Sequence, residues 1–199
     1  MLKLNVSAPT ELLWALIGLI LTIGGTFLEA SIMNVPWLWE HQGTITQSLG
    51  VSYQIAAVLL VGCLGGKNAG LMSQLAYLAL GLTWLDIFTQ GGGFGYVQSP
   101  TFGYLLGFVP GAWVCGSLAF QMPPRLESLA LSCVSGLLTI HAVGISYLAI
   151  ARWGGWLTAT SGSWLQQVLL YSLHPLPGQL AIACAVTVLA FGLRRLMFY

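Results

Sequence analysis

Six stretches of the chain are apolar over enough consecutive residues to be membrane helices. They lie at about 11–29, 46–65, 68–87, 102–121, 127–150 and 176–194. The apolar runs are continuous rather than alternating, which favours helices over the strands of a closed barrel. A helix of about 20 residues crosses the roughly 30 Å hydrocarbon core, so each stretch can span the bilayer once. The pattern predicts an all-α integral membrane protein, with residues 1–199 forming a single six-helix membrane domain.

Lysine and arginine residues between these stretches predict the orientation of the domain. Only Arg152 lies on the side opposite the termini, whereas the termini side carries Lys3, Lys67, Arg125, Arg194 and Arg195. Because positive residues are enriched in cytoplasmic loops, both termini are predicted to be cytoplasmic. Three loops then face outward and can form one site: the glycine-rich loop, the loop with Glu29, Glu40 and His41, and the loop with Arg152.

Composition and charge agree with this class and exclude several others. The chain is 57% hydrophobic and only 6% charged, too little charge for the surface of a soluble protein, so a multi-pass protein of the cell membrane is predicted. A net charge of +1 without a basic run excludes nucleic acid as a partner. We expect the first apolar run to stay as a helix, since no clear signal-peptidase site follows it.

Catalytic and metal-binding patterns are missing from the sequence. The run from Gly65 to Asn68, GGKN, lacks the first glycine and the final Ser or Thr of a phosphate-binding loop, so the chain alone is not expected to hydrolyse ATP. Its acids and histidines have no ligand spacing, which argues against an enzyme, a cofactor or a metal site. The four cysteines, Cys63, Cys115, Cys133 and Cys184, have no CxxC spacing and are interpreted as small buried packing residues.

The stretch from Gln90 to Gly111, QGGGFGYVQSPTFGYLLGFVPG, changes from a polar, glycine-rich half to an apolar half. Glycine lets backbone groups approach a ligand closely, so the first half is a candidate binding loop, although a simple connector has the same composition. In the second half, Gly103, Gly107 and Gly111 recur every four residues, which predicts close packing of a membrane helix.

Polar residues inside the apolar runs must face protein or a cavity, because unpaired polar groups are costly in lipid. Gln54 and Gln74 are therefore predicted to point inward, and Gln74 is better explained by a hydrogen bond between helices. A lone His141 is typical of a hydrogen-bonded core residue, with a functional role as the alternative. A stripe of Gly18, Thr22 and Thr26 can admit a close neighbour, either another helix of this chain or a separate protein.

The segment FTQGGGFGYVQSPTFGYLLGF resembles the glycine-rich segment of the BioY family, the biotin-binding S components of energy-coupling-factor transporters. Members carry a PVF-x-(N/G)-GG…GPT-x-GYL-x-GF pattern there. A second region of similarity covers Val51, Ser52, Gln54, Gly62, Gly66, Gly70, Tyr77, Leu78 and Gly81, with Gly50 in place of the usual proline.

One part of the family pattern is altered. The family's LPGD-x-x-K run, whose Asp and Lys contribute to its biotin site, is matched here by Pro177 and Gly178. Gln179 stands in place of the Asp and Ile182 in place of the Lys. Gln179 can still accept and donate hydrogen bonds, but the charge-assisted strength of a carboxylate is lost.

The resemblance implies an S component that captures biotin from outside, with a membrane-embedded T component and two ATPase subunits as partners. The ligand-binding residues that we expect are Gln54, Gln90, Gly91, Gly92, Gly93, Gln98, Tyr104 and Gln179. Gly18 and Thr22 are the expected partner-docking residues, as a loose substitute for the family's small-residue motif. An S component for lipoate or thiamin, or a solitary biotin facilitator, remains an alternative.

Overall fold

The computed structural model describes residues 8–33, 46–157 and 163–198. Its elements are, in order, α1 (Ala8–Thr26), β1 (Glu29–Met33), β2 (Thr46–Ser52), α3 (Gln54–Thr83), the 3-10 helix η2 (Phe94–Gln98), α4 (Phe102–Gln121), α5 (Leu126–Gly154), α6 (Trp164–Val168), the π-helical turn η3 (Leu169–Leu173) and α7 (Leu176–Phe198). Within these ranges, five helical stretches are long and apolar enough to cross a membrane: α1, α3, α4, α5 and the continuous stretch Trp164–Met197. The prediction of an all-α membrane protein is confirmed at this level.

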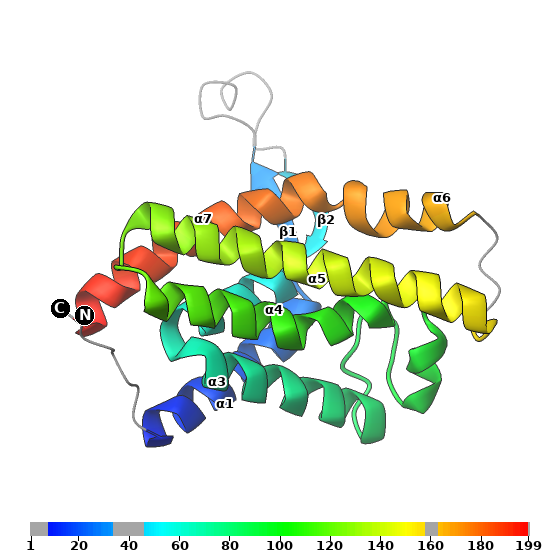
Figure 1. The fold of residues 1–199 in the computed structure, drawn as a ribbon, viewed down its shortest axis with the longest axis horizontal. Helices are drawn as coiled ribbons and strands as arrows, with labels where there is room; N and C mark the ends of the chain where they lie inside the picture. The colour runs from blue at the N-terminus through cyan, green and yellow to red at the C-terminus, as the bar shows by residue number, and fades with distance from the viewer. Residues whose placement is uncertain (1–7, 34–45, 158–162, 199) are drawn as a thin grey trace.

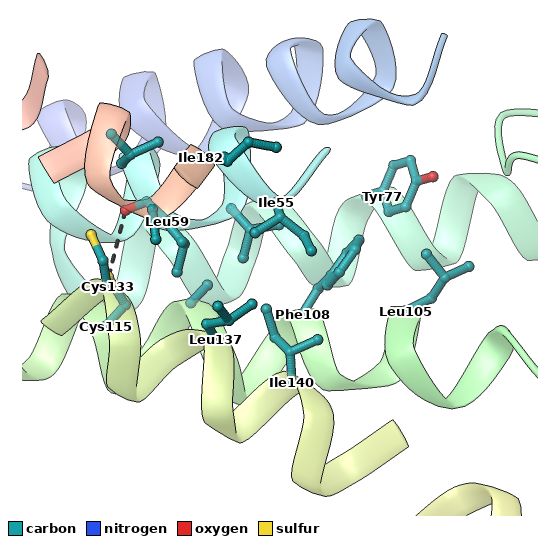
Figure 2. Close-up of a cluster of buried hydrophobic side chains, with 14 of the residues drawn as sticks. Ile55, Leu59, Tyr77, Leu105, Phe108, Cys115, Cys133, Leu137, Ile140 and Ile182 are labelled. Atoms are coloured by element: carbon teal, nitrogen blue, oxygen red, sulfur yellow. Dashed lines mark hydrogen bonds between the residues drawn. The ribbon is translucent and has the colours of Figure 1, made fainter. Parts of the chain in front are cut away.

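The long helices run along the same axis of the molecule, with α4 and α5 side by side at its centre (Figure 1). The start of α1 and the end of α7 lie at the same end of the bundle, at the left of this view. Between the helices lies a core of buried side chains such as Leu59, Phe108, Leu137 and Ile140 (Figure 2). Close van der Waals packing of such side chains stabilises the helix contacts, because lipid offers no hydrophobic driving force between helices.

Helix α3 folds back on itself. Gly66 inside it has φ 82° and ψ −177°, a backbone conformation that interrupts the helix. The amide Nε2 of Gln54 lies 2.6 Å from the hydroxyl of Tyr77, although 23 residues of straight helix would separate them by about 35 Å. The stretches predicted as separate helices at 46–65 and 68–87 are therefore largely the two arms of α3.

The predicted helix start at residue 46 is wrong. Residues Thr46–Ser52 form β2, which pairs antiparallel with β1 and places Glu29 opposite Ser52 and Met33 opposite Thr46. Gly50 has a positive φ of 65°, which is incompatible with a regular helix, and the pairing satisfies the backbone groups instead. The predicted ends at 29 and 87 are also too late, since Glu29 already belongs to β1 and α3 ends at Thr83.

The later helices follow the prediction more closely. Helix α4 has the predicted bounds of 102–121. Helix α5 continues to Gly154, four residues past the predicted end, and stops where Gly155 adopts a left-handed conformation that favours glycine at a helix end. Helix α7 likewise extends past the predicted end at 194.

The glycine ridge of α4 packs against α5, as predicted. A Cβ atom on Gly107 would lie 2.7 Å from the backbone oxygen of Ile140, and one on Gly111 would lie 2.6 Å from the Ile140 side chain. Both distances are shorter than a real Cβ contact, so only glycine permits this approach. The ridge therefore brings α4 and α5 together along their length.

The small-residue stripe of α1 faces α3 of the same chain. A Cβ on Gly18 would lie 2.7 Å from both Val61 and Ser73, which belong to different arms of α3. Thr22 is fully buried and accepts a hydrogen bond of 3.0 Å from Gln74 Nε2. Of the two neighbours left open by the sequence, the structure favours another helix of this chain, and neither Gly18 nor Thr22 is at the surface. The prediction that Gln74 bonds between helices is confirmed.

Candidate ligand-binding cavity

A cavity of about 190 Å³ lies where the starts of α3, α4 and α7 meet. Its wall combines aromatic rings from three elements, Tyr104 and Phe108 of α4, Tyr96 of η2 and Tyr171 of η3. Apolar side chains such as Ile55 and Ile140 add to this wall, and polar groups come from Ser52, Gln54, Thr89, Thr101 and Gln179. A mostly apolar hollow with a few polar groups is typical of a small-molecule site.

Gln54 is held in place by the fold around the first turn of α3. Its amide Nε2 donates to Thr26 Oγ1 at 2.8 Å and to the Tyr77 hydroxyl at 2.6 Å. Its carbonyl Oε1 lies 3.4 Å from the Ser52 hydroxyl, which also lines the cavity. With both amide hydrogens engaged by protein, the carbonyl oxygen is the atom that Gln54 offers as an acceptor to a ligand.

Gln179 is held by His141 through its carbonyl oxygen, whereas Gln54 is held through its amide nitrogen. Gln179 Oε1 lies 2.6 Å from His141 Nε2, and the Tyr104 ring packs edge-on against the imidazole with centroids 5.8 Å apart. A carbonyl oxygen only accepts, so in this arrangement the imidazole Nε2 donates and the amide NH₂ of Gln179 remains as a donor. The prediction that His141 is a hydrogen-bonded core residue is confirmed.

Hydroxyl groups line the side of the cavity next to the glycine-rich loop. The Tyr104 hydroxyl lies 2.7 Å from Ser172 Oγ and links α4 to η3, and the Tyr96 hydroxyl lies 3.0 Å from Thr101 Oγ1. Burial raises the pKa of Tyr96 above its usual value, although its hydrogen bond with Thr101 acts in the opposite direction. Tyr96 is therefore a neutral hydroxyl throughout the physiological pH range.

The glycine-rich loop forms a second, outer hollow beside the cavity. Gln90 and Gly92 line this hollow of about 420 Å³, which shares Tyr96 and Tyr171 with the cavity. Phe88 and Gly91 exchange backbone hydrogen bonds of 2.9 and 3.1 Å, so Gln90 lies at the tip of a tight turn. The turn requires the positive φ of Gly91, 112°. Tyr147 of α5 donates to the backbone oxygen of Val97 and fixes the far end of the loop.

The predicted ligand-binding residues thus separate into three groups. Gln54, Tyr104 and Gln179 line the cavity. Gln90 and Gly92 line the adjoining hollow, while Gly91 and Gly93 give the loop its positive-φ conformation. The exposed side chain of Gln98 lines neither.

Comparisons with known proteins identify the family of the chain. The model of the BioY family matches residues 8–198. The chain belongs to the BioY family. It is 35% identical over 171 residues to a probable biotin transporter BioY from Lysinibacillus sphaericus, covering 85% of this chain and 79% of that protein. It is 27% identical to an uncharacterized 21.2 kDa protein of Cyanophora paradoxa, covering 94% and 95% of the two chains.

A solved structure has the same fold. The crystal structure of the S-component for biotin from an ECF-type ABC transporter superposes with a TM-score of 0.67, at 19% sequence identity and covering 96% of this chain and 95% of that one. Family and fold together make this chain a multi-pass membrane transport protein rather than an enzyme. The resemblance given by the glycine-rich segment is confirmed.

Gln179 and Ile182, the two positions that differ from the LPGD-x-x-K run of the resemblance, lie in different surroundings. Ile182 is buried among apolar side chains of the core and does not line the cavity. None of the described residues that line the cavity carries a charged side chain. Gln179 is instead joined to His141 by a hydrogen bond.

Several cavity residues were missed in the sequence. Tyr171 and Phe108 lie in apolar runs where spacing gives no sign of a ligand. Tyr96 and Thr101 belong to the glycine-rich stretch that was predicted as a candidate binding loop. Their position in that loop could have identified them as cavity residues. Tyr171 is identified only by the fold, because η3 packs over the starts of α4 and α7.

Proposed function

We propose that this chain is the substrate-binding S component of an ECF-type transporter and that its cavity binds biotin. The observation that carries the proposal is the complementary pair of amides in an uncharged aromatic cavity. Gln54 offers a carbonyl acceptor beside Ser52, and Gln179 offers an amide donor. A ureido group has one carbonyl oxygen and two N–H groups, and it can pair with such a set.

The rest of the biotin molecule suits the remaining wall. Its fused ring and aliphatic chain would pack against the aromatic and apolar side chains Tyr104, Phe108 and Ile140. Its carboxylate would lie toward Tyr96 and Thr101, whose hydroxyls can donate hydrogen bonds, or reach the outer hollow with Gln90. This placement needs no cation, in keeping with Ile182 at the position of the family lysine.

We further propose six membrane crossings with both termini in the cytoplasm, the two arms of α3 crossing separately. Gln54, Tyr104 and Gln179 each lie in the first turns of a helix, and α1 begins and α7 ends at the other end of the bundle. With Arg194 and Arg195 on the cytoplasmic side, the cavity opens outward. Biotin would then be captured from the outer side.

Transport would need partner subunits, since the sequence has no ATP-binding motif. Docking of a T component would use the outer face of α1, where Leu12, Leu16 and Ile20 are exposed, in place of the buried Gly18 and Thr22. Two ATPase subunits would complete the transporter. A cavity without charged side chains among its described residues could also hold the apolar ring and chain of lipoate. Another vitamin therefore remains the second candidate.

Uptake of radiolabelled biotin tests this proposal in a biotin-auxotrophic bacterial host without its own transporter. The chain is expressed alone and together with a T component and two ATPase subunits. We expect biotin accumulation only with the partners, and its loss when the ATPases are inactivated. Full accumulation by the chain alone would establish the solitary facilitator instead, and no accumulation with functional partners would contradict biotin as the substrate.

A further inference from the structure

Three cysteines from three different helices meet in the core of the bundle. The Sγ atom of Cys63 in α3 lies 3.6 Å from that of Cys115 in α4 and 3.6 Å from that of Cys133 in α5. All three Sγ atoms lie within 4.8 Å of one another, and all three residues are buried. In Figure 2, Cys115 and Cys133 lie together beside Leu59, at the end of the core away from Tyr77.

We propose that Cys63, Cys115 and Cys133 bind one thiophilic d¹⁰ metal ion, Zn²⁺ or Cu⁺. Thiolate sulfur is the ligand that these ions share as a preference. Three sulfurs each about 2.3 Å from one ion lie about 3.8 Å apart in a tetrahedral site and about 4.0 Å apart in a trigonal one. The two separations from Cys63, both 3.6 Å, need to lengthen by only a few tenths of an ångström, and Cys115 and Cys133, within 4.8 Å of each other, need to approach by at most about 1 Å. Small χ1 rotations can supply both changes.

A buried cation lies next to the cluster and can balance the charge of a metal–thiolate group. Arg194 of α7 is buried, and its Nε donates to the backbone oxygen of Cys63 at 2.8 Å while its Nη1 donates to that of Ala119 at 2.8 Å. Three thiolates with Zn²⁺ carry one negative charge, which Arg194 balances. Cu⁺ with two thiolates and one thiol gives the same neutral sum, which suits a bilayer interior.

The cluster lies near a second hollow and is separate from the ligand cavity. A hollow of about 430 Å³ is lined by Pro124, Phe191, Arg194 and Arg195, so it reaches the arginine that contacts Cys63. Seven residues of helix, about 10 Å, separate Cys115 from the cavity residue Phe108, and Cys133 from Ile140. The ion would therefore join α3, α4 and α5 beneath the cavity floor and stabilise the fold, as binding to the native state alone does.

Metal retention by the purified full-length protein in detergent tests the proposal. The protein is reduced, stripped with a chelator and dialysed without oxygen, in one arm against Zn²⁺ and in the other against Cu⁺ held by a competing chelator. We expect one equivalent of ion per chain by mass spectrometry in at least one arm, which also identifies the ion. The variants Cys115→Ala and Cys133→Ala should bind about tenfold more weakly or worse.

Cys184→Ala is the matched control, since Cys184 is the fourth cysteine and lies exposed on α7. It should retain the ion like the wild type. Co²⁺ gives an independent signal, because thiolate ligation produces sulfur-to-cobalt charge-transfer bands that Cys63→Ser should lose. Gel filtration of each variant verifies folding. Absence of a retained ion in both arms, or retention unchanged in the folded cluster variants, would overturn the proposal.

Discussion

Two glutamine side chains in the cavity are oriented by protein groups before any ligand arrives. Gln54 is held by Thr26 and Tyr77, and Gln179 by His141. Such pre-organisation lowers the entropy cost of binding, because the amides need no reorientation. The sequence identified both glutamines, since an amide in an apolar run must have a partner. It did not identify which of their atoms remain for a ligand, because Tyr77 and His141 approach only in the folded chain.

Gln179→Ala is expected to weaken biotin binding about tenfold, the equivalent of ~1.4 kcal/mol for a lost hydrogen bond to a buried ligand group. The affinity is measured by calorimetry on purified protein. Gln98→Ala is the matched control, because its exposed amide lines neither hollow, and it should bind like the wild type. Equal affinity of Gln179→Ala and wild type would remove Gln179 from the site.

At the scale of elements, the apolar pattern predicted the helices and the interruption near Gly66 but not the strand β2. The pattern located the helices of the chain, because long apolar runs in lipid have few structural choices. It missed β2, since a short strand that pairs with β1 depends on a partner distant in sequence. It divided α3 near the correct residue, because Gly65 and Gly66 interrupt the run of helix-forming side chains.

Gly66→Ala is expected to lower stability by roughly 1–3 kcal/mol, because its φ of 82° with ψ near 180° is a conformation that side chains rarely adopt. The thermal unfolding midpoint in detergent should fall accordingly. Gly24→Ala is the control: nothing lies within 4 Å of the added Cβ, so the midpoint should stay or rise slightly. A Gly66→Ala midpoint equal to that of the wild type would show that the turn in α3 tolerates a side chain.

For the whole molecule, the side of the membrane on which the cavity opens depends on the orientation of the helix bundle. The family and the fold could be predicted from the glycine-rich segment. Its residues 88–101 form one wall of the cavity and of the adjoining hollow. The docking stripe was ambiguous in the sequence, since a small-residue spacing looks the same whether it meets its own chain or a partner. Contacts of Gly18 with both arms of α3 resolve that ambiguity.

Reporter fusions test the orientation. A fluorescent protein fused to either terminus should be fluorescent, as expected in the cytoplasm, whereas alkaline phosphatase inserted after Gly155, at the end of α5, should be active outside. Phosphatase activity at a terminus would place the cavity on the cytoplasmic side and contradict capture from outside.

Equilibrium binding of radiolabelled biotin to the purified chain in detergent tests the central claim most directly, with lipoate and thiamin as competitors. The account predicts saturable binding at one site per chain, undiminished by either competitor and constant between about pH 6 and 9, because neutral groups line the cavity. No saturable binding of biotin, or its displacement by equimolar lipoate or thiamin, would contradict a biotin-specific cavity.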